Sequence, residues 1–334
     1  MENTNNEVYK HYIAIDWSQE IVAVASMRDS SSSIKVQTLL PDTRSLKQYL
    51  KSYPGKKILT VEETTTSHWL YVELKDCVDK ILICDPYRNG LLKDGPKTDK
   101  LDASNLCKLL RSGMLKEVFH SMDKSYEIRK LVSAYEDFIK ASVRFKNQRS
   151  ALFRAEGKNH KKEKEIRGSK MSCFVNEKQL EIIRHIEDIR SEFETKYRDI
   201  SKENATIRRL MNISGIGLKT AVTIYSVVID ANRFKNKYKY WAYCGLVKHQ
   251  KDSGNRNYGS KVIRHSKLLK RSYKVATLAA ISGNNDIREY YEFLLQTGCG
   301  FEEARNQITR YIAKVSYATI KNQTEYQPYQ WRKK

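Results

Sequence analysis

Two aspartates three residues apart stand at a predicted helix start, and a third aspartate ends a predicted strand. Asp99 and Asp102 follow Thr98, which can cap a helix whose dipole favours acidic residues in its first turn. Residues three apart share a helix face, so both carboxylates can point at one spot. Asp16 ends the apolar run 12–15. Carboxylates converging from separate elements can hold a divalent cation that acts on a phosphodiester, although an isolated aspartate pair is more typical of an ordinary acidic first turn.

A fourth acid comes from one of two adjacent glutamates. Glu62 and Glu63 follow the apolar run 58–61, and strand alternation turns one of them inward and the other outward. The preceding run slightly favours Glu62, and a solvated strand end is the competing interpretation. Four acids on one surface repel one another unless a cation lies among them. Oxygen ligands of this kind select Mg²⁺ or Mn²⁺ over zinc.

A glycine turn and a serine loop form a second group of candidates. Gly215 and Gly217 flank an isoleucine and precede a predicted helix carrying Lys219, which has the form of a helix-hairpin-helix turn. Glycine lets backbone amides approach a phosphate, and the helix N-terminus favours the anion. A plain turn between helices explains the same pattern equally well. The sequence therefore leaves phosphate contact at this turn as one of two interpretations.

Ser253 lies in a polar loop, predicted over 248–260, and is followed by glycine. A serine hydroxyl is a poor nucleophile unless a base, or a metal with nearby cations, assists it. Taken alone, the Ser-Gly pair predicts only a turn. Cations that bracket this loop or precede the aspartate pair are candidate phosphate contacts, namely Lys97, Lys251, Arg256, Lys261 and Arg264.

The charge of the whole chain indicates a polyanionic partner. The 334 residues include 61 Lys and Arg against 39 Asp and Glu, a net charge of +22. Nucleic acid is the first expectation and an anionic membrane surface the second. No run of about 18 apolar residues predicts a membrane span, and the polar, acidic N-terminus is unlike a signal peptide, so we expect a cytoplasmic, nucleoid-associated protein.

Cysteine and histidine spacing argues against zinc. The six cysteines show no C-x-x-C pair, and the seven histidines form no H-x-x-x-H pair. We expect the cysteines to be reduced and mostly buried.

The elements that would position the acids have an α/β order. Strands are expected at 10–16, 20–27, 34–40, 58–61 and 81–84, with helices after the third and fourth strands. This order predicts a ribonuclease-H-like domain over residues 1–120, which would present its site at the strand ends.

The remainder is predicted to be mostly helical. Apolar stripes indicate one long helix over 123–156 and a second over 176–211, which makes 121–205 an antiparallel hairpin with a basic connecting loop. Core packing explains these stripes, and an oligomerisation coiled coil is the alternative. Residues 206–334 are predicted to form a helical C-terminal domain that carries Ser253.

In its motifs and in their order along the chain, the protein resembles the DEDD-type insertion-sequence transposases, also called bridge-RNA-guided serine recombinases. The N-terminal motifs are I-D ending at Asp16, E-x-T from Glu62, D-P-Y-R-N from Asp85, and K-T-D-K-L-D-A from Lys97. The later motifs are I-S-G-I-G, F-x-N-K, W-A-Y-C-G-L and D-S-G-N-R, within residues 213–256. The resemblance covers nearly the whole chain.

The resemblance implies a RuvC-like N-terminal domain and a C-terminal transposase domain. It implies that Asp16, Glu62 or Glu63, Asp99 and Asp102 bind Mg²⁺ or Mn²⁺. It further implies that Ser253 attacks DNA and holds it as a phosphoserine. The family acts as a dimer of dimers on DNA paired to a structured non-coding RNA.

Two departures from the family pattern affect this assignment. Glu63 replaces the small residue that often follows the glutamate in relatives, and Asp252 replaces a second serine. Two other functions fit the same residues: a junction nuclease that uses water, and a non-catalytic nucleic-acid-binding protein.

Overall fold

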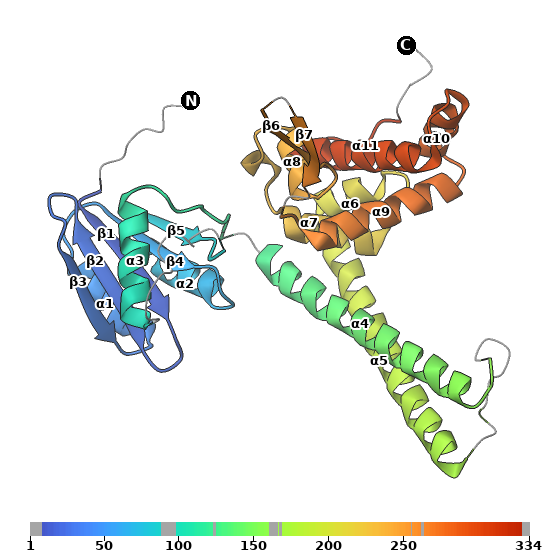
Figure 1. The fold of residues 1–334 in the computed structure, drawn as a ribbon, viewed down its shortest axis with the longest axis horizontal. Coiled ribbons are helices and arrows are strands. Elements are labelled where there is room, and N and C mark those ends of the chain that lie inside the picture. The colour runs from blue at the N-terminus through green and yellow to red at the C-terminus, as the bar shows by residue number, and fades with distance from the viewer. Residues whose placement is uncertain are drawn as a thin grey trace. The chain divides into compact units, whose positions relative to one another are not determined.

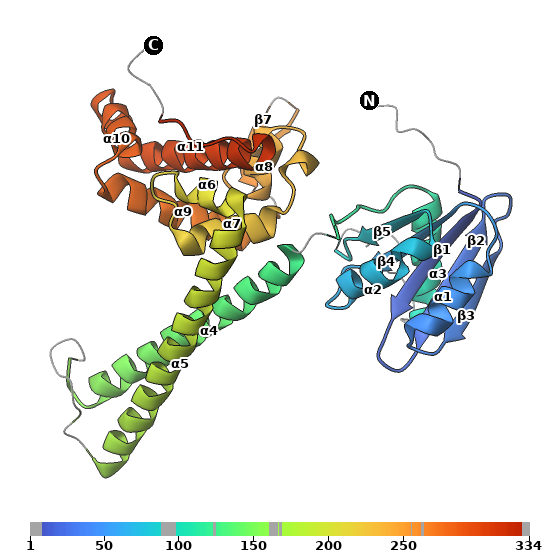
Figure 2. The ribbon, with the colours of Figure 1, turned by 180° about the vertical axis from the view of Figure 1, so that it is seen from behind.

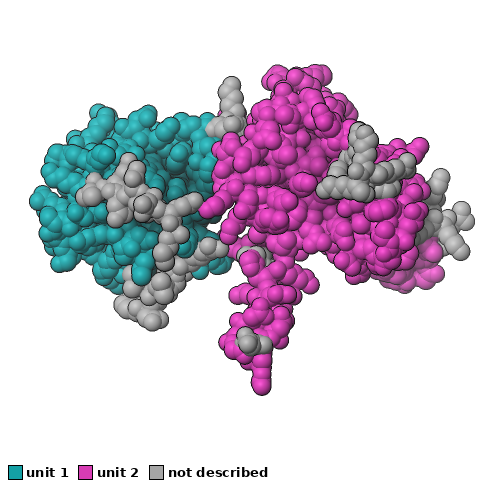
Figure 3. All heavy atoms as spheres, turned by 90° about the horizontal axis from the view of Figure 1, so that it is seen from above, with its two compact units in different colours: residues 1–122 teal, residues 123–334 magenta. Residues whose placement is uncertain are grey.

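The computed structural model describes residues 9–87, 98–122, 125–159, 166, 169–254, 256–261 and 264–328. The chain divides into two compact units, residues 1–122 and residues 123–334 (Figure 3). The predicted helical hairpin and the predicted C-terminal domain therefore belong to one compact unit.

The first unit is built on a five-stranded mixed sheet with strand order β3-β2-β1-β4-β5. β1 runs antiparallel to β2, which is antiparallel to β3, whereas β4 and β5 run parallel to β1. This arrangement is consistent with a ribonuclease-H-like domain and confirms the five predicted strands to within about two residues at each end. The elements are β1 His11–Trp17, β2 Val22–Arg28, β3 Ile34–Leu39, α1 Thr43–Lys51, β4 Lys57–Glu62, α2 Ser67–Leu74, a 3₁₀ turn Lys75–Cys77, β5 Lys80–Cys84 and α3 Asp99–Arg111.

Helices cover both faces of this sheet. α3 lies on one face, and α1 and α2 lie on the other (Figures 1 and 2). Because side chains alternate along a strand, Ala14 and Ile58 pack in the core with α3. Ile13, Ile15 and Val61 pack in the core on the opposite face.

The second unit is almost entirely helical. Its two longest helices, α4 and α5, pair in antiparallel orientation, as shown by the ion pair Lys146–Glu187 and the hydrogen bond from Arg149 to Asn176. The elements are α4 Ser125–Ala155, α5 Lys170–Glu203, α6 Ala205–Met211, α7 Leu218–Val228, a 3₁₀ turn Ala231–Arg233, α8 Lys237–Tyr243, β6 His249–Ser253, β7 Arg256–Lys261, α9 Lys267–Ser282, α10 Asp286–Gln296 and α11 Phe301–Asn322.

The single helix predicted over 176–211 is wrong at its start, because α5 already begins at Lys170, and in its continuity. The helix ends before Asn204, whose backbone is extended and whose side chain accepts a hydrogen bond from the Ile207 amide at 3.1 Å. Asparagine is favoured at such a cap because its side chain satisfies an amide that the helix leaves unpaired. The apolar stripe continues across the break, which is why periodicity alone does not reveal it.

A core around α7 organises the second unit. Almost every residue of α7 after its first turn is buried, and α4, α5, α6 and α9 pack around it. The buried hydroxyls of Tyr240 and Tyr273 hydrogen bond to each other and tie α8 to α9.

All six cysteines are free. Cys84, Cys107 and Cys244 are buried, whereas Cys77 and Cys299 are partly buried and Cys173 is exposed, so half of the cysteines are buried and not most of them. No helix among the described residues is long and apolar enough to cross a bilayer.

Candidate active site and nucleic-acid interface

Asp16 and Glu62 lie side by side at the ends of parallel strands. β1 and β4 are in register with Ile15 opposite Val61, so the next residues on both strands are Asp16 and Glu62. Both side chains are partly buried. Neighbouring strands are about 4.8 Å apart, which leaves two carboxylates within reach of one cation.

The strand pleat separates the two glutamates. Val61 is buried in the core with α1 and α2, so Glu62 faces the opposite side of the sheet, together with Ile58. Asp16 shares that face through Ala14. Glu63 follows the strand end, where alternation places it on the other face. The register therefore favours Glu62 as the partner of Asp16.

The aspartate pair opens α3, the helix on this same face. Thr98 caps the helix, and its hydroxyl oxygen accepts a hydrogen bond from the Leu101 amide at 3.3 Å. Asp99 is exposed and Asp102 is partly buried. The buried residues of α3 begin at Ala103, so the two acids lie where the helix emerges from the core.

Hydrogen bonds fix the direction of α3 along the sheet. The Cys107 thiol donates to the Tyr12 carbonyl at 3.3 Å, and the Arg111 guanidinium donates to the Ser31 and Asp29 carbonyls at 2.8 Å. Those two carbonyls follow β2, at the sheet end where β1 begins. α3 therefore runs antiparallel to β1, and its N-terminus points toward the end that carries Asp16.

The rise along α3 and along β1 places Asp99 and Asp16 at the same height along the strand direction. Asp99 precedes Cys107 by a helical rise of about 12 Å. Asp16 follows Tyr12, the partner of Cys107, by about 13 Å of strand. Asp16, Glu62 and the start of α3 thus share one edge of one face of the sheet.

The donor set at this edge consists of carboxylates, which are hard oxygen ligands that fit Mg²⁺ or Mn²⁺. Among the described residues, no group of three or more Asp, Glu, His or Cys side chains is gathered closely enough to hold a metal ion. The fold thus brings the four acids to one edge without drawing them into a coordination sphere.

Ser253 lies at the tip of a two-stranded hairpin, not in the irregular loop that its polar sequence suggests. β6 and β7 pair in antiparallel orientation, with Ser253 opposite Arg256 and with Gly254 in the left-handed region at φ +55°. Opposite residues point to the same side of a hairpin with Cβ atoms about 5 Å apart. The Arg256 side chain therefore leaves the backbone beside the exposed Ser253. Lys251 and Lys261 are exposed on the same hairpin.

The glycine turn between α6 and α7 has a packing explanation. Gly215 has φ +86°, and a Cβ at this position would lie 2.3 Å from the Ala276 carbonyl oxygen and 2.8 Å from the Ala280 Cβ on α9. Gly217 is different, because it is exposed and no atom lies within 4 Å of the place of its missing Cβ. Only Gly217 therefore leaves open space in which a phosphate could approach the start of α7.

Lys219 is engaged within the protein. Its ammonium forms an ion pair with Glu194 at 2.5 Å and lies 5.8 Å from the centre of the Tyr135 ring. The Tyr135 hydroxyl also donates to Glu194 at 2.9 Å. Burial opposes the charged form of Glu194, but the hydrogen bonds from Lys219 and Tyr135 outweigh it and lower the pKa of this carboxyl. Phosphate contact by Lys219 would compete with this ion pair.

Two further cations complete the predicted interface. Arg264 follows the hairpin and is exposed. Lys97 lies outside the described residues, so its placement is a prediction from sequence only.

Two models of known protein families match the chain. One is described as a transposase, of the DEDD type found in IS110 elements, and matches residues 13–155. The other is described as the transposase IS116/IS110/IS902 family and matches residues 207–292. This chain belongs to the IS110 family of transposases.

Each of the two family matches contains one of the two groups of candidate residues. The DEDD match spans the sheet, α3 and α4, and thus contains Asp16, Glu62, Asp99 and Asp102. Transposases of this kind use acidic residues and divalent metal ions. The second match spans α6 to α10 and contains both the glycine turn and the Ser253 hairpin.

A curated relative agrees with the family. The transposase for insertion sequence element IS1111A of Coxiella burnetii (strain RSA 493 / Nine Mile phase I) is 23% identical over 139 residues. The match covers 40% of this chain and 38% of that protein.

One group of basic residues is not predicted from the sequence as a group, although Lys248 borders the polar loop that carries Ser253. Lys248, Lys270, Lys274 and Arg310 line one cavity, although they come from three distant segments. The sequence signal was the four-residue spacing of Lys270 and Lys274, which places both on one helix face.

Proposed function

We propose that this IS110-family protein is a recombinase that cleaves and rejoins DNA strands through a phosphoserine intermediate. The observation that carries the proposal is the placement of Asp16 and Glu62 on the sheet face whose helix begins with Asp99 and Asp102. The exposed Ser253, with Arg256 opposite it, supports the second half of the proposal.

Each group of residues has a defined part in this reaction. The four acids would hold Mg²⁺ or Mn²⁺, which supplies charge stabilisation at the attacked phosphate. The Ser253 oxygen attacks the phosphorus and loses its proton to solvent, while the phosphorus–oxygen bond to one side of the strand breaks. The released strand end takes up a proton as a hydroxyl. Arg256 offsets the charge that develops on the phosphate oxygens.

Rejoining reverses these bonds with a different strand end. The hydroxyl of an incoming strand attacks the phosphoserine, and Ser253 leaves with its proton restored. Since both steps exchange one phosphate ester for another, the joining needs no external energy source.

The proposed partners are donor and target DNA, a structured non-coding RNA that pairs with the DNA, and further copies of this chain in a dimer of dimers. The net charge of +22 supports a nucleic-acid partner. In the assembly, the acids of one copy would act with the serine of another.

A denaturing gel of labelled DNA tests the chemistry. Wild type with Mg²⁺ is expected to give a slowly migrating protein–DNA adduct that protease treatment removes. Ser253→Ala and Asp102→Asn are each expected to abolish the adduct, and Glu63→Gln serves as the control that retains it. Free cleaved strands that persist in Ser253→Ala would indicate a nuclease that uses water. Intact DNA in every lane, with salt-dependent binding, would indicate a binding protein.

A further inference from the structure

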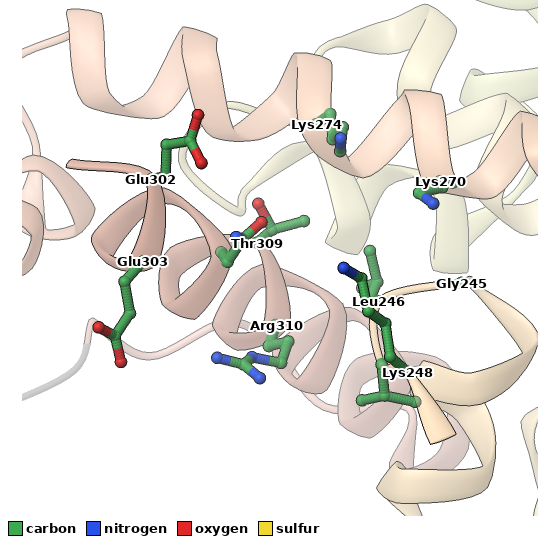
Figure 4. A pocket seen from close by; sticks show the side chains of 11 residues that line it. Gly245, Leu246, Lys248, Lys270, Lys274, Glu302, Glu303, Thr309 and Arg310 are labelled. Carbon is green, nitrogen blue, oxygen red and sulfur yellow. The ribbon is translucent and has the colours of Figure 1, made fainter. Parts of the chain in front are cut away.

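A basic cavity lies in the second unit at the base of the Ser253 hairpin. Its volume is about 760 Å³, within the range of sites that hold a ligand of drug or nucleotide size. Three segments form its walls: the chain after α8, one face of α9, and the first half of α11 (Figure 4). Its charged lining residues are Lys248, Lys270, Lys274, Arg310, Glu302 and Glu303. We call it the α9–α11 cavity.

The charges in the α9–α11 cavity are unbalanced. Four cations face two carboxylates, and none of the four cations forms an ion pair within the described part of the chain. Figure 4 shows the two glutamates toward one end, with Lys248 and Lys270 toward the other. Four cations that share a cavity with only two carboxylates leave a net positive charge, and an anion among the cations relieves their repulsion. The cavity therefore fits a phosphate at its basic end.

The α9–α11 cavity is tied to the hairpin at both of the hairpin's ends. Lys248 precedes β6 directly, and the Ser266 amide after β7 donates to the Tyr243 carbonyl at 2.9 Å. Gly245 lines the cavity, and a Cβ there would lie 2.3 Å from the His265 ring. The absence of this side chain lets the chain leaving β7 pack against the chain entering β6. Lys248 is five residues from Ser253, which is about 17 Å of strand.

We propose that the α9–α11 cavity binds a backbone phosphate of the DNA strand that Ser253 attacks. Stacked nucleotides advance about 3.4 Å each along a strand, so a phosphate in the cavity lies within about five nucleotides of the attacked one. Glu302 and Glu303 repel phosphate and confine the backbone to the basic end. This inference rests on the proposed function, because it assigns the strand to the one being cut.

The test combines charge removal in the protein with charge removal in the DNA. Neutral methylphosphonate linkages are placed singly along a labelled strand, and binding is measured for wild type and for the double variant Lys270→Gln/Lys274→Gln. A neutral linkage at the contacted phosphate is expected to weaken wild-type binding several-fold and to have no effect on the double variant. The affected linkage is expected within about five nucleotides of the cleavage position.

Salt dependence gives a second measurement. Each lost phosphate contact lowers the magnitude of the slope of log K against log salt by about 0.7 to 0.9. The slope of the double variant is therefore expected to be smaller than that of wild type by at least this amount. The control is Lys140→Gln/Lys196→Gln, which removes the same charge from the α4–α5 hairpin, away from the cavity lining. This control is expected to leave the pattern of sensitive linkages unchanged. Thermal unfolding of both double variants verifies that the fold is intact.

The outcomes separate this inference from the proposed function. Equal linkage sensitivity in wild type and in Lys270→Gln/Lys274→Gln overturns the inference, whether or not the adduct forms. The inference is also overturned if Lys270→Gln/Lys274→Gln binds RNA of the same sequence more weakly than wild type does but binds DNA equally well. If a neutral linkage weakens binding only when Lys270 and Lys274 are present, but the protein forms no adduct, the cavity binds a phosphate and the recombinase chemistry is refuted.

Discussion

Replacement of Gly215 by alanine distinguishes a packing role from phosphate binding at the glycine turn. The added Cβ would lie 2.3 Å from the Ala276 carbonyl oxygen and 2.9 Å from the Ala280 amide nitrogen, both backbone atoms of α9 that cannot move independently. The residue also has φ +86°, a conformation that costs a residue with a side chain roughly 1–2 kcal/mol. Overpacking adds about 1–3 kcal/mol. We therefore expect Gly215→Ala to lower the free energy of unfolding by about 2–5 kcal/mol.

Thermal unfolding of the full chain measures this loss. The second unit spans residues 123–334, a size at which 1 kcal/mol shifts Tm by about 2–4 °C, so a drop on the order of 10 °C is expected. The matched control is Gly217→Ala, where φ is −84° and no atom lies within 4 Å. At this N-cap position alanine caps the helix less well than glycine, which lowers stability, but it also restricts the unfolded chain, which raises stability. Because the two effects oppose each other, the free energy of unfolding should change by no more than about 1 kcal/mol.

DNA affinity, measured at a temperature where both variants are folded, completes this comparison. Gly215→Ala is expected to retain wild-type affinity, whereas Gly217→Ala should weaken binding if the start of α7 approaches a phosphate. If Gly215→Ala unfolds at the wild-type temperature and binds DNA poorly, Gly215 does not have the packing role that its contacts with α9 indicate.

Three further predictions concern the scaffold around the two sites. Thr98→Ala should lower the stability of the first unit by about 1 kcal/mol through loss of the α3 cap, and Thr98→Ser should not; equal denaturant midpoints for both would contradict the cap. Burial raises the pKa of the Cys107 thiol to about 12, so iodoacetamide at mildly alkaline pH should leave it unmodified while exposed Cys173 reacts, as peptide mass spectrometry can check. Glu194→Gln removes the ion pair with half-exposed Lys219 and should cost about 0.5–1 kcal/mol near neutral pH. Because the pKa of Glu194 is lowered on folding, its contribution to stability is present above the usual carboxyl pKa of about 4 and fades as the pH falls below it. A wild-type advantage that persists in acid would contradict this.

The sheet could be predicted from sequence because its strands are local apolar runs. The run before Asp16 and the run before Glu62 are short, buried and rich in β-branched residues, and each ends where polar residues begin. Their parallel pairing is a long-range contact that no local pattern encodes. The choice between Glu62 and Glu63 depends on that pairing and on which face α3 covers, so it required the structure.

The hairpin and the α9–α11 cavity were hidden for a different reason. Every residue of β6 and β7 is exposed, so no alternation of apolar and polar residues marks them as strands. Backbone pairing and the left-handed Gly254 define the hairpin instead. The cavity brings together α9, α11 and the segment after α8, which become neighbours only through the tertiary packing of the second unit.

In the proposed reaction, the Ser253 oxygen becomes covalently joined to DNA. Wild-type protein is incubated with the DNA, the proposed guide RNA and Mg²⁺, then digested with nuclease and protease, and the peptides are analysed by mass spectrometry. We expect a nucleotide mass on the peptide that contains Ser253, and we expect it to be absent when EDTA replaces Mg²⁺ and absent in Asp16→Asn. Cleaved DNA without any nucleotide-bearing peptide, or a nucleotide attached to a different residue, would contradict it.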